Sequence, residues 1–195
     1  MVVIYLIRHG ETDFNKNGFC QGRSDVPLNE NGKISAKKLA DIFLLNHISI
    51  NAIYSSPLLR AKETAMIISK YSNKNENILV DHAFIERDFG ELECKEVNYV
   101  RKIVTNPTQV KEVKNYENDE TVANRFYDGL YKIAKNSFNQ TILVVSHSHA
   151  IKCLLMKIDP SKYSISTKTK NMNTTKIIFN DNKFIVDKFD CFNIN

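Results

Sequence analysis

The sequence predicts an α/β domain in which helices cover both faces of a mainly parallel, mixed β-sheet, forming a three-layer αβα sandwich. Three observations support this prediction. Segments of strand length alternate with segments of helical periodicity, the first strand-like segment is apolar throughout, and the chain closes with two strand-like segments joined by a turn. A chain of 195 residues, 43% of them hydrophobic, can bury one sizeable core. We therefore expect a single domain over residues 1–195.

The first half of the chain alternates strands with helices. The apolar run after Met1 has the length of a buried strand, and the segment that follows repeats its apolar residues at helical spacing. A second helix has a well-marked start, because Ser56 is a typical N-cap residue and Pro57 suits the first helical position. The expected strands lie at 2–7, 52–54 and 77–81, and the expected helices at 32–46 and 57–71.

The second half begins with a polar segment, 94–115, whose periodicity is ambiguous. The elements expected after it are helices at 120–138 and 150–158 and strands at 141–147, 174–180 and 183–189. Asp181 and Asn182 lie between the last two strands, and this pattern is typical of a β-hairpin. Alternation followed by a terminal hairpin predicts a mainly parallel sheet with helices on both faces.

Composition argues against several classes of protein. The formal net charge is +5, but the lysines are scattered and no aromatic platform accompanies them, so no nucleic acid is expected as partner. No apolar run is long enough to cross a bilayer, and residues 1–7 lack the features of a signal peptide. The four separated cysteines fit neither a disulfide framework nor a zinc site. We expect a cytoplasmic protein with reduced thiols, no membrane association and no metal.

Charged and imidazole side chains follow the expected strands at the points where these strands end. Arg8 and His9 follow the first strand, Arg60 lies in the first helical turn after the second, and His147 ends the fourth. Glu86 lies in the loop after the third strand. Because loops at the carboxyl ends of parallel strands form one crevice, we expect these five side chains to meet there.

This set of side chains suits the transfer of a phosphoryl group. Two guanidiniums can neutralise charge on phosphate oxygens, and the helix start beside Arg60 would add unpaired backbone donors. One neutral imidazole could attack phosphorus while the other stabilises the oxygens, since adjacent cations disfavour imidazolium. Glu86 could protonate the departing alcohol and then activate water. The scheme needs neither a metal nor another cofactor.

Each of these residues has a simpler interpretation when it is taken alone. A histidine at a strand end is more often structural or solvated, and Arg60 could be an ordinary helix-surface cation. Glu86 could merely pair with Arg87 at the surface. The placement of all five candidates at strand-end junctions favours the functional interpretation.

Five motifs in this order resemble the histidine phosphatase superfamily, in its phosphoglycerate mutase-like branch. They are "LIRHGETDFN", "GRSDVPLNENGKISAKKLA", "YSSPLLRAKETA", "ERDFGELE" and "LVVSHSHAI", and they run over most of the chain. The resemblance implies the phosphoglycerate mutase-like αβα sandwich, in agreement with the pattern of elements. It further implies that His9 is phosphorylated during turnover and that Glu86 is the proton donor.

The resemblance also implies a phosphate pocket. The expected phosphate and substrate contacts are Arg8, Asn15, Gln21, Arg60, His147 and, through its backbone, Ser148. Thr12 matches a small polar position beside the pocket. The partner implied by these contacts is a small phosphorylated metabolite.

Two departures from the family pattern bear on the substrate. His149 stands where members often have a small residue, and it adds bulk at the rim; a metal site made of His147 and His149 would lack a carboxylate or cysteine companion. Cys94 stands where many members have glycine. We expect a partly buried thiol without a role there rather than a redox switch.

Chain length separates two activities within the family. The mutases are longer, with an insertion after the acidic loop and a C-terminal tail that cover the pocket and hold off water. Little chain follows the final hairpin here, and alignment on Gly90 puts Val97 where the mutases keep a substrate-binding lysine. We therefore expect a metal-independent phosphomonoesterase, with phosphoglycerate mutase-type transfer as the alternative.

Functions of a different class stay open. The chain could bind a phospholigand without turnover, or bind nucleic acid, but the intact set of five side chains and the scattered lysines argue against these functions. Sugar phosphates, phosphoglycerate, a cobalamin-precursor phosphate and nucleotide monophosphates are all compatible with the pocket. The choice among them depends on a rim that we place at Arg23, Arg87, residues 94–118 and His149. The sequence does not predict the oligomeric state.

Overall fold

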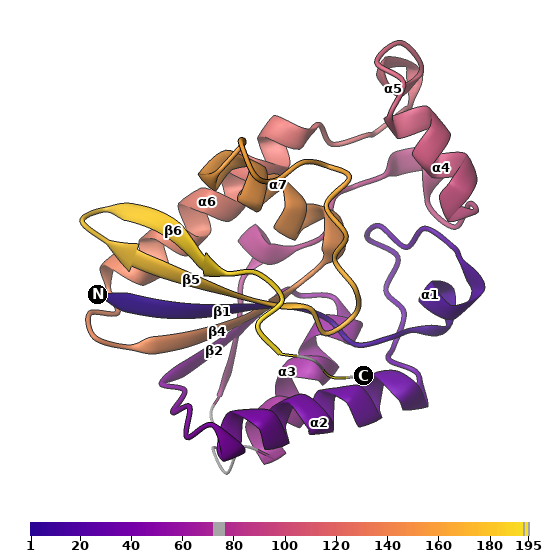
Figure 1. Cartoon of the computed structure of the whole chain (residues 1–195). Coiled ribbons are helices and arrows are strands. Elements are labelled where there is room, and N and C mark those ends of the chain that lie inside the picture. The colour runs from indigo at the N-terminus through magenta and orange to yellow at the C-terminus, as the bar shows by residue number, and fades with distance from the viewer. Residues whose placement is uncertain (72–76, 193, 195) are drawn as a thin grey trace.

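The computed structural model describes residues 1–71, 77–192 and 194, and a six-stranded mixed sheet forms its centre (Figure 1). The strands are β1 (Val2–Arg8), β2 (Ala52–Ser55), β3 (Ile78–Val80), β4 (Thr141–Ser146), β5 (Thr174–Asn180) and β6 (Lys183–Lys188). Their order in the sheet is β3-β2-β4-β1-β5-β6. The first four in this order pair in parallel, whereas β5 is antiparallel to both of its neighbours. The predicted mainly parallel sheet is confirmed.

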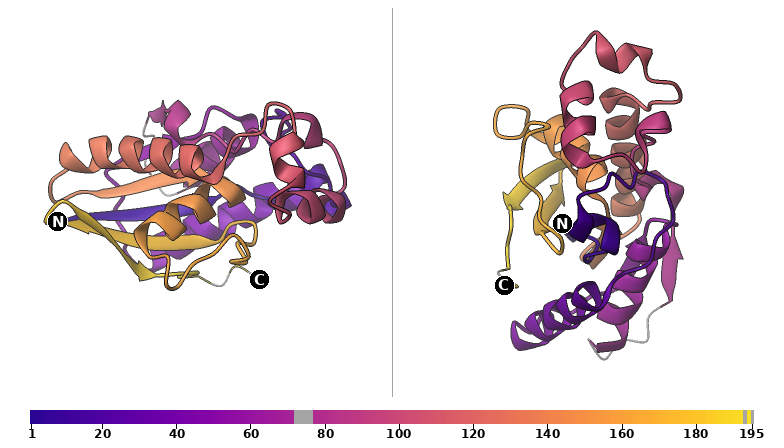
Figure 2. Two further views of the ribbon diagram at one scale, coloured as in Figure 1. Left: turned by 90° about the horizontal axis from the view of Figure 1, so that it is seen from above. Right: turned by 90° about the vertical axis from the view of Figure 1, so that its right-hand side faces the viewer.

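Helices cover both faces of the sheet (Figures 1 and 2). They are α2 (Glu30–Leu45) and α3 (Leu59–Tyr71) on one face, and α6 (Asp119–Lys135) and α7 (Ser148–Ile158) on the other. Alternate side chains of β1 divide between the two cores, with Leu6 facing α6 and α7 and Ile7 facing α2 and α3. The apolar run at the start of the chain is therefore a strand buried on both faces, as the αβα prediction requires.

Several helix boundaries differ from their predicted positions. α2 begins two residues early because the Asn29 side chain accepts a hydrogen bond from the Gly32 N–H. α6 ends at Lys135, and Phe138 beyond it is 76% exposed. α7 begins at Ser148 rather than at residue 150.

The predicted start of α3 at Pro57 was wrong, because α3 begins at Leu59. Ser56 Oγ accepts a hydrogen bond from the Leu58 N–H (3.2 Å), and the Leu59 N–H donates to Asp25 Oδ1 (2.6 Å). These donors at the helix start are therefore paired within the protein, and the expectation that they would be free for phosphate was also wrong.

The ambiguous polar segment forms two short helices, α4 (Val97–Val104) and α5 (Gln109–Glu112). Val100, Ile103 and Val104 pack with Cys20 and Phe89 in a third, smaller hydrophobic cluster. Together with α1 (Asp13–Asn17), which the sequence did not predict, these helices lie beyond the carboxyl end of β1 (Figures 1 and 2). They therefore stand over the edge of the sheet where the candidate residues emerge.

The hairpin at the carboxyl end is confirmed. Asp181 and Asn182 connect β5 to β6 and have φ angles of 49° and 61°. Two consecutive residues with positive φ are typical of a type I′ turn, whose twist matches that of the flanking strands. Among the described residues, no helix has both the length and the apolar composition that a bilayer crossing requires.

Candidate active site

Strand register brings the two predicted imidazoles together. β1 and β4 are parallel neighbours with Arg8 opposite Ser146, and the His9 N–H donates to the Ser146 carbonyl (3.0 Å). A histidine follows directly after each of these strands, and the ring centroids of His9 and His147 lie 5.1 Å apart. Their side chains are 2% and 0% exposed, respectively.

The His9 imidazole is held in one orientation. Its Nδ1 lies 2.7 Å from the Gly10 carbonyl oxygen, which can only accept, so Nδ1 carries the proton and Nε2 keeps a lone pair. Burial, followed by the charges of Arg60 and Arg8, holds the pKa of His9 well below its usual range. The ring is therefore neutral, and its Nε2 carries a lone pair.

Arg60 donates hydrogen bonds both to the His9 imidazole and to a neighbouring loop. Its Nε–H donates to His9 Nε2 (3.3 Å), and its two terminal nitrogens donate to the carbonyls of Ser24 (2.8 Å) and Gly22 (2.7 Å). Burial lowers the pKa of Arg60 to about 10, so the guanidinium stays charged at neutral pH. Three of the five N–H donors of a guanidinium are thus used, and two remain for phosphate oxygens.

The loop that binds Arg60 is itself fixed by Glu93. This carboxylate accepts from the Arg23 N–H (2.7 Å), the Ser24 N–H (3.0 Å) and the Ser24 hydroxyl (2.8 Å). Gly22 has a φ of 53°, and a Cβ at this position would lie 2.1 Å from Glu93 Oε1. Only glycine fits here, because both the backbone conformation and the close carboxylate exclude a side chain.

His147 is oriented by Ser56. The imidazole Nε2 and the serine Oγ are 2.7 Å apart, and the same Oγ already accepts from the Leu58 N–H. Donation of the hydroxyl proton to Nε2 pairs every group of Ser56 and leaves the proton of His147 on Nδ1. That Nδ1 is buried without a partner among the described residues, so it is a free donor inside the site. Burial and the Arg60 charge hold the pKa of His147 well below its usual range.

Glu86 lies at the amino end of α7. Its Oε1 accepts from the backbone N–H groups of Arg87 and Ala150 (both 2.9 Å), and its Oε2 accepts from the His149 N–H (3.2 Å). The residue is 6% exposed, which rules out the interpretation as a surface pair with Arg87. The His149 backbone donor, which could have faced an anion, is occupied by this carboxylate.

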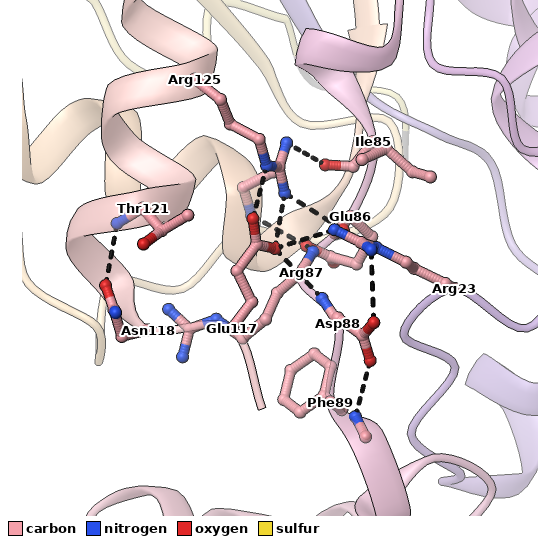
Figure 3. A network of polar contacts seen from close by, with 12 residues as sticks. Arg23, Ile85, Glu86, Arg87, Asp88, Phe89, Glu117, Asn118, Thr121 and Arg125 are labelled. Atoms are coloured by element: carbon pink, nitrogen blue, oxygen red, sulfur yellow. Dashed lines mark hydrogen bonds and ion pairs between the residues drawn. The ribbon is translucent and has the colours of Figure 1, made fainter. Parts of the chain in front are cut away.

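Three charged side chains fix the main chain at Glu86 (Figure 3). Arg125 donates to the carbonyls of Ile85 (2.7 Å) and Glu86 (3.2 Å), and Arg23 Nε donates to the same Glu86 carbonyl (3.4 Å). The Glu117 carboxylate lies between the two guanidiniums, accepting from Arg125 Nε (2.8 Å) and from an Arg23 terminal nitrogen (3.2 Å). This network holds α6, the Glu86 loop and the loop of residue 23 together.

Two arginines that were predicted at the rim lie elsewhere. Arg23 belongs to the network just described, and Arg87 is 1% exposed. The Arg87 guanidinium contacts the Tyr116 hydroxyl, the Asp119 carboxylate and Cys153 Sγ, the last at 3.0 Å. Neither arginine lines the cavity beside His9, so this part of the rim prediction was wrong.

One cavity of about 620 Å³ opens beside His9. Its lining includes all but one of the predicted site residues, namely Arg8, His9, Asn15, Gln21, Arg60, Glu86 and Ser148. His147 lies behind His9, with its ring fully buried. Arg8 donates to the Thr169 carbonyl (2.5 Å), and burial lowers its pKa to about 10.

Two residues that the sequence did not indicate, Thr64 and Asn171, support the His9 loop. The Thr64 hydroxyl accepts from the Gly10 N–H (3.0 Å), and Asn171 Nδ2 donates to the carbonyls of His9 and Gly10 (both 3.1 Å). Ser56, assigned only to a helix cap, orients His147. A common residue type far along the chain gives no local signal of such contacts. Thr12, expected beside the pocket, is buried and its hydroxyl contacts Gln21 Oε1 (3.0 Å).

The two departures from the family pattern have separate outcomes. The His149 ring lies against Phe89, with centroids 4.9 Å apart, and lines the cavity as predicted for a rim residue. Cys94 is exposed rather than partly buried, and its φ of 63° explains why glycine suits this position. No three His, Cys, Asp or Glu side chains within the described residues gather closely enough to hold a metal ion.

Comparisons with known proteins identify the family of the chain. The family model described as histidine phosphatase superfamily (branch 1) matches residues 4–191. The phosphatase PhoE of Bacillus subtilis is 33% identical over 191 residues, which is 97% of this chain and 95% of that protein. Both comparisons extend over almost the whole chain rather than over the motifs alone.

Two solved structures share the fold. A phosphoserine phosphatase from Entamoeba histolytica, solved with 3-phosphoglyceric acid, is 26% identical with a TM-score of 0.84, and the match covers 100% of this chain and 99% of that one. A phosphoglycerate mutase from Bacillus anthracis is 26% identical with a TM-score of 0.86, covering 97% and 92% of the two chains. The phosphoglycerate mutase-like architecture that was predicted is therefore confirmed.

Proposed function

The chain belongs to the histidine phosphatase superfamily, and from this premise we propose that it is a metal-independent phosphomonoesterase acting through phospho-His9. One observation carries the proposal: the Gly10 carbonyl fixes the proton of His9 on Nδ1, and Nε2 faces the cavity beside the Arg60 guanidinium. Attack on phosphorus requires a neutral imidazole with an unprotonated Nε2, and the lone pair of this Nε2 must exchange its hydrogen bond from Arg60 Nε–H for the bond to phosphorus.

In the first step, the lone pair of His9 Nε2 attacks phosphorus and the bond between phosphorus and the ester oxygen breaks. Arg8 and Arg60 neutralise the charge on the phosphoryl oxygens, and the free Nδ1–H of His147 donates to one of them. The alcohol leaves with a proton from Glu86, which lies on the cavity wall. The products of this step are the alcohol and a phosphohistidine.

In the second step, Glu86 accepts a proton from water while the water oxygen attacks phosphorus. The bond between phosphorus and Nε2 breaks, inorganic phosphate leaves, and His9 regains its lone pair. The paired backbone around His9 and Arg60 needs no rearrangement between the steps, which keeps the cost of reorganisation low.

We propose a small phosphorylated metabolite as substrate. A cavity of about 620 Å³ has room for a phosphoryl group and several further carbon, oxygen or nitrogen atoms. Similarity to a phosphoserine phosphatase that was solved with 3-phosphoglyceric acid supports a substrate of this size. A cytoplasmic location stays a prediction of the sequence.

The proposal is tested by hydrolysis of p-nitrophenyl phosphate in excess EDTA. We expect phosphate release by the native protein and its loss in His9→Ala, with His82→Ala, an exposed histidine outside the cavity, as the matched control. Release of phosphate by His9→Ala at the native rate would remove His9 as nucleophile. Interconversion of phosphoglycerates without net phosphate release would instead establish the mutase alternative.

A further inference from the structure

Asn171 lies behind the phosphate end of the cavity, the end that Arg8, His9 and Arg60 line. It belongs to the segment between α7 and β5. Its neighbour Lys170 lines the cavity, whereas Asn171 lines only a separate, smaller cleft of about 110 Å³. A ligand in the cavity therefore does not contact the Asn171 side chain, and any effect of this residue on the reaction passes through another residue.

One end of the Asn171 amide faces three oxygen atoms. The carbonyl oxygens of His9 and Gly10 each lie 3.1 Å away, and Asn15 Oδ1 lies 3.0 Å away. All three oxygens can only accept hydrogen bonds, so the amide atom that faces them is Nδ2. The Gly10 carbonyl also accepts from His9 Nδ1 (2.7 Å). Asn171 thus holds the acceptor that fixes the proton of the imidazole.

The contact with Asn171 also fixes the Asn15 amide. Asn15 Oδ1 accepts from Asn171 Nδ2 and, at the longer distance of 3.3 Å, from the Thr12 N–H in the capping box of α1. Because both partners are donors, the oxygen of this amide lies toward them and Nδ2 lies on the other side. Asn15 Nδ2 has no hydrogen-bond partner within the ranges that the structure describes, and Asn15 lines the cavity.

We propose that Asn171 is a positioning residue, which aims the two N–H groups of Asn15 Nδ2 at the phosphoryl oxygens. The proposal rests on the proposed function, since it takes the phosphoryl group to bind at His9. The oxygen and the nitrogen of an amide have nearly the same shape, so packing does not select between the two orientations of Asn15. Only hydrogen bonds select, and Asn171 makes the shorter of the two that do.

Without Asn171, the Asn15 amide can turn by half a rotation. Its oxygen would then face the phosphoryl group, and an acceptor repels an anion where a donor would bind it. The loss of Asn171 should therefore weaken phosphate binding by removing a donor that belongs to Asn15. Its contacts with the carbonyls of His9 and Gly10 predict a different result, because that effect would not depend on Asn15.

A double-mutant cycle separates these two routes. NMR titration with inorganic phosphate measures the Kd of the native protein, Asn15→Ala, Asn171→Ala and the double variant. We expect each single substitution to weaken binding by about tenfold, the effect of one charge-assisted hydrogen bond. The double variant should bind phosphate about as weakly as either single variant, because Asn171 has nothing left to aim.

The same titration tests the proposal in the native protein. The side-chain NH2 signals of Asn15, identified by their loss in Asn15→Ala, should shift when phosphate saturates the protein. The control is Asn46→Ala, which removes an exposed amide that donates to the Ile42 carbonyl (2.8 Å) outside the cavity and should leave the Kd unchanged.

Two results would overturn the proposal. One is an additive loss of about a hundredfold in the double variant, which would assign Asn171 to the His9 loop instead. The other is a set of Asn15 side-chain signals that do not move in the native protein at saturating phosphate. Since binding is measured without turnover, a native protein that binds phosphate but does not hydrolyse p-nitrophenyl phosphate would contradict the proposed function alone.

Discussion

The two ends of the cavity are built in opposite ways. At the phosphate end, Arg60 makes three hydrogen bonds, and the His9 loop is held by Thr64 and Asn171. At the other end, Arg101 and Lys152 have no hydrogen-bond partner among the described residues. One end is complete before a ligand arrives, and the other presents charges that only a ligand would pair.

This difference separates the part of the cavity that favours catalysis from the part that would affect the choice of substrate. Donors that are already fixed need no reorganisation during the reaction, so rigidity at the phosphate end favours catalysis. Arg101 on α4 is exposed and costs little to keep unpaired, whereas burial already lowers the pKa of the unpaired Lys152 on α7. Substitutions at the first end should therefore lower activity strongly, even when they are conservative. Substitutions at the second end should alter the choice of substrate.

The largest effect is expected for Arg60. Arg60→Lys should lower kcat/KM by about a thousandfold, close to the effect of Arg60→Ala, because one ammonium cannot bond to His9, Gly22 and Ser24 from one planar group. Steady-state kinetics with p-nitrophenyl phosphate measure this, with Lys62→Met on the same helix as control. Recovery of most activity by lysine would show that charge alone suffices at this end.

Glu86→Gln should slow poor leaving groups more than good ones. An alkyl phosphate, whose alcohol needs a proton to leave, should lose about a hundredfold in kcat/KM, whereas p-nitrophenyl phosphate should lose much less. Glutamine keeps one acceptor oxygen, which can still accept from the Arg87 and Ala150 N–H groups, while its NH2 gives up the contact with the His149 N–H. Equal losses for both esters would assign Glu86 to helix capping rather than proton transfer.

The network behind Glu86 should affect stability more than specificity. Arg125→Met leaves the Ile85 carbonyl without its guanidinium donor, leaves the Glu86 carbonyl with Arg23 alone and removes a partner of Glu117, so we expect the free energy of unfolding to fall by about 2 kcal/mol. Urea denaturation followed by circular dichroism measures the loss. A ratio of 3-phosphoglycerate to glycerol 3-phosphate hydrolysis that also changed would mean that this network reaches the second end of the cavity.

A further prediction concerns the dependence of stability on pH. The pKa values of His9, His147 and His149 are held well below their usual range, chiefly by burial. Below about pH 6.5 the unfolded chain binds protons at these rings while the folded chain does not, so stability falls as pH falls. Each ring contributes about 1.4 kcal/mol per pH unit in that window.

Denaturant unfolding between pH 7 and pH 5 measures this slope. His149→Gln should reduce the slope of stability against pH by about 1.4 kcal/mol per pH unit. The control is His82→Gln, which changes an exposed ring. A stability that rose as the pH was lowered through this range would show that the buried rings are charged in the folded protein.

The sequence was most informative where local pattern decides structure. Period and composition identified the six strands and the hairpin turn at Asp181 and Asn182, because buried strands and type I′ turns have strong local signals. The same patterns predicted that His9 and His147 would meet, since parallel neighbouring strands end at one edge. The start of α3 was wrong because Asp25, distant in sequence, pairs the first helical N–H.

The features that the sequence could not predict depend on contacts between segments that are distant in the sequence. Nothing local marks Asn171 or Thr64 as supports of the His9 loop, because each acts through a contact with a distant segment. Arg23 and Arg87 have the residue type of a phosphate-binding rim, yet neighbouring carboxylates and a main-chain carbonyl bind their guanidiniums. Arg101 lay in the ambiguous segment, where α4 is only eight residues long and its apolar spacing is too brief to stand out among polar neighbours.

The central claim is that His9 Nε2 becomes phosphorylated. The most direct measurement mixes Glu86→Gln with labelled p-nitrophenyl phosphate, whose leaving group needs little help while attack by water is slowed, and quenches the reaction in alkali within milliseconds. We predict one phosphoryl group on His9 Nε2, located by mass spectrometry and phosphorus NMR and absent from His9→Ala. Label on His147, or release of phosphate with no labelled protein at any time, would contradict the account.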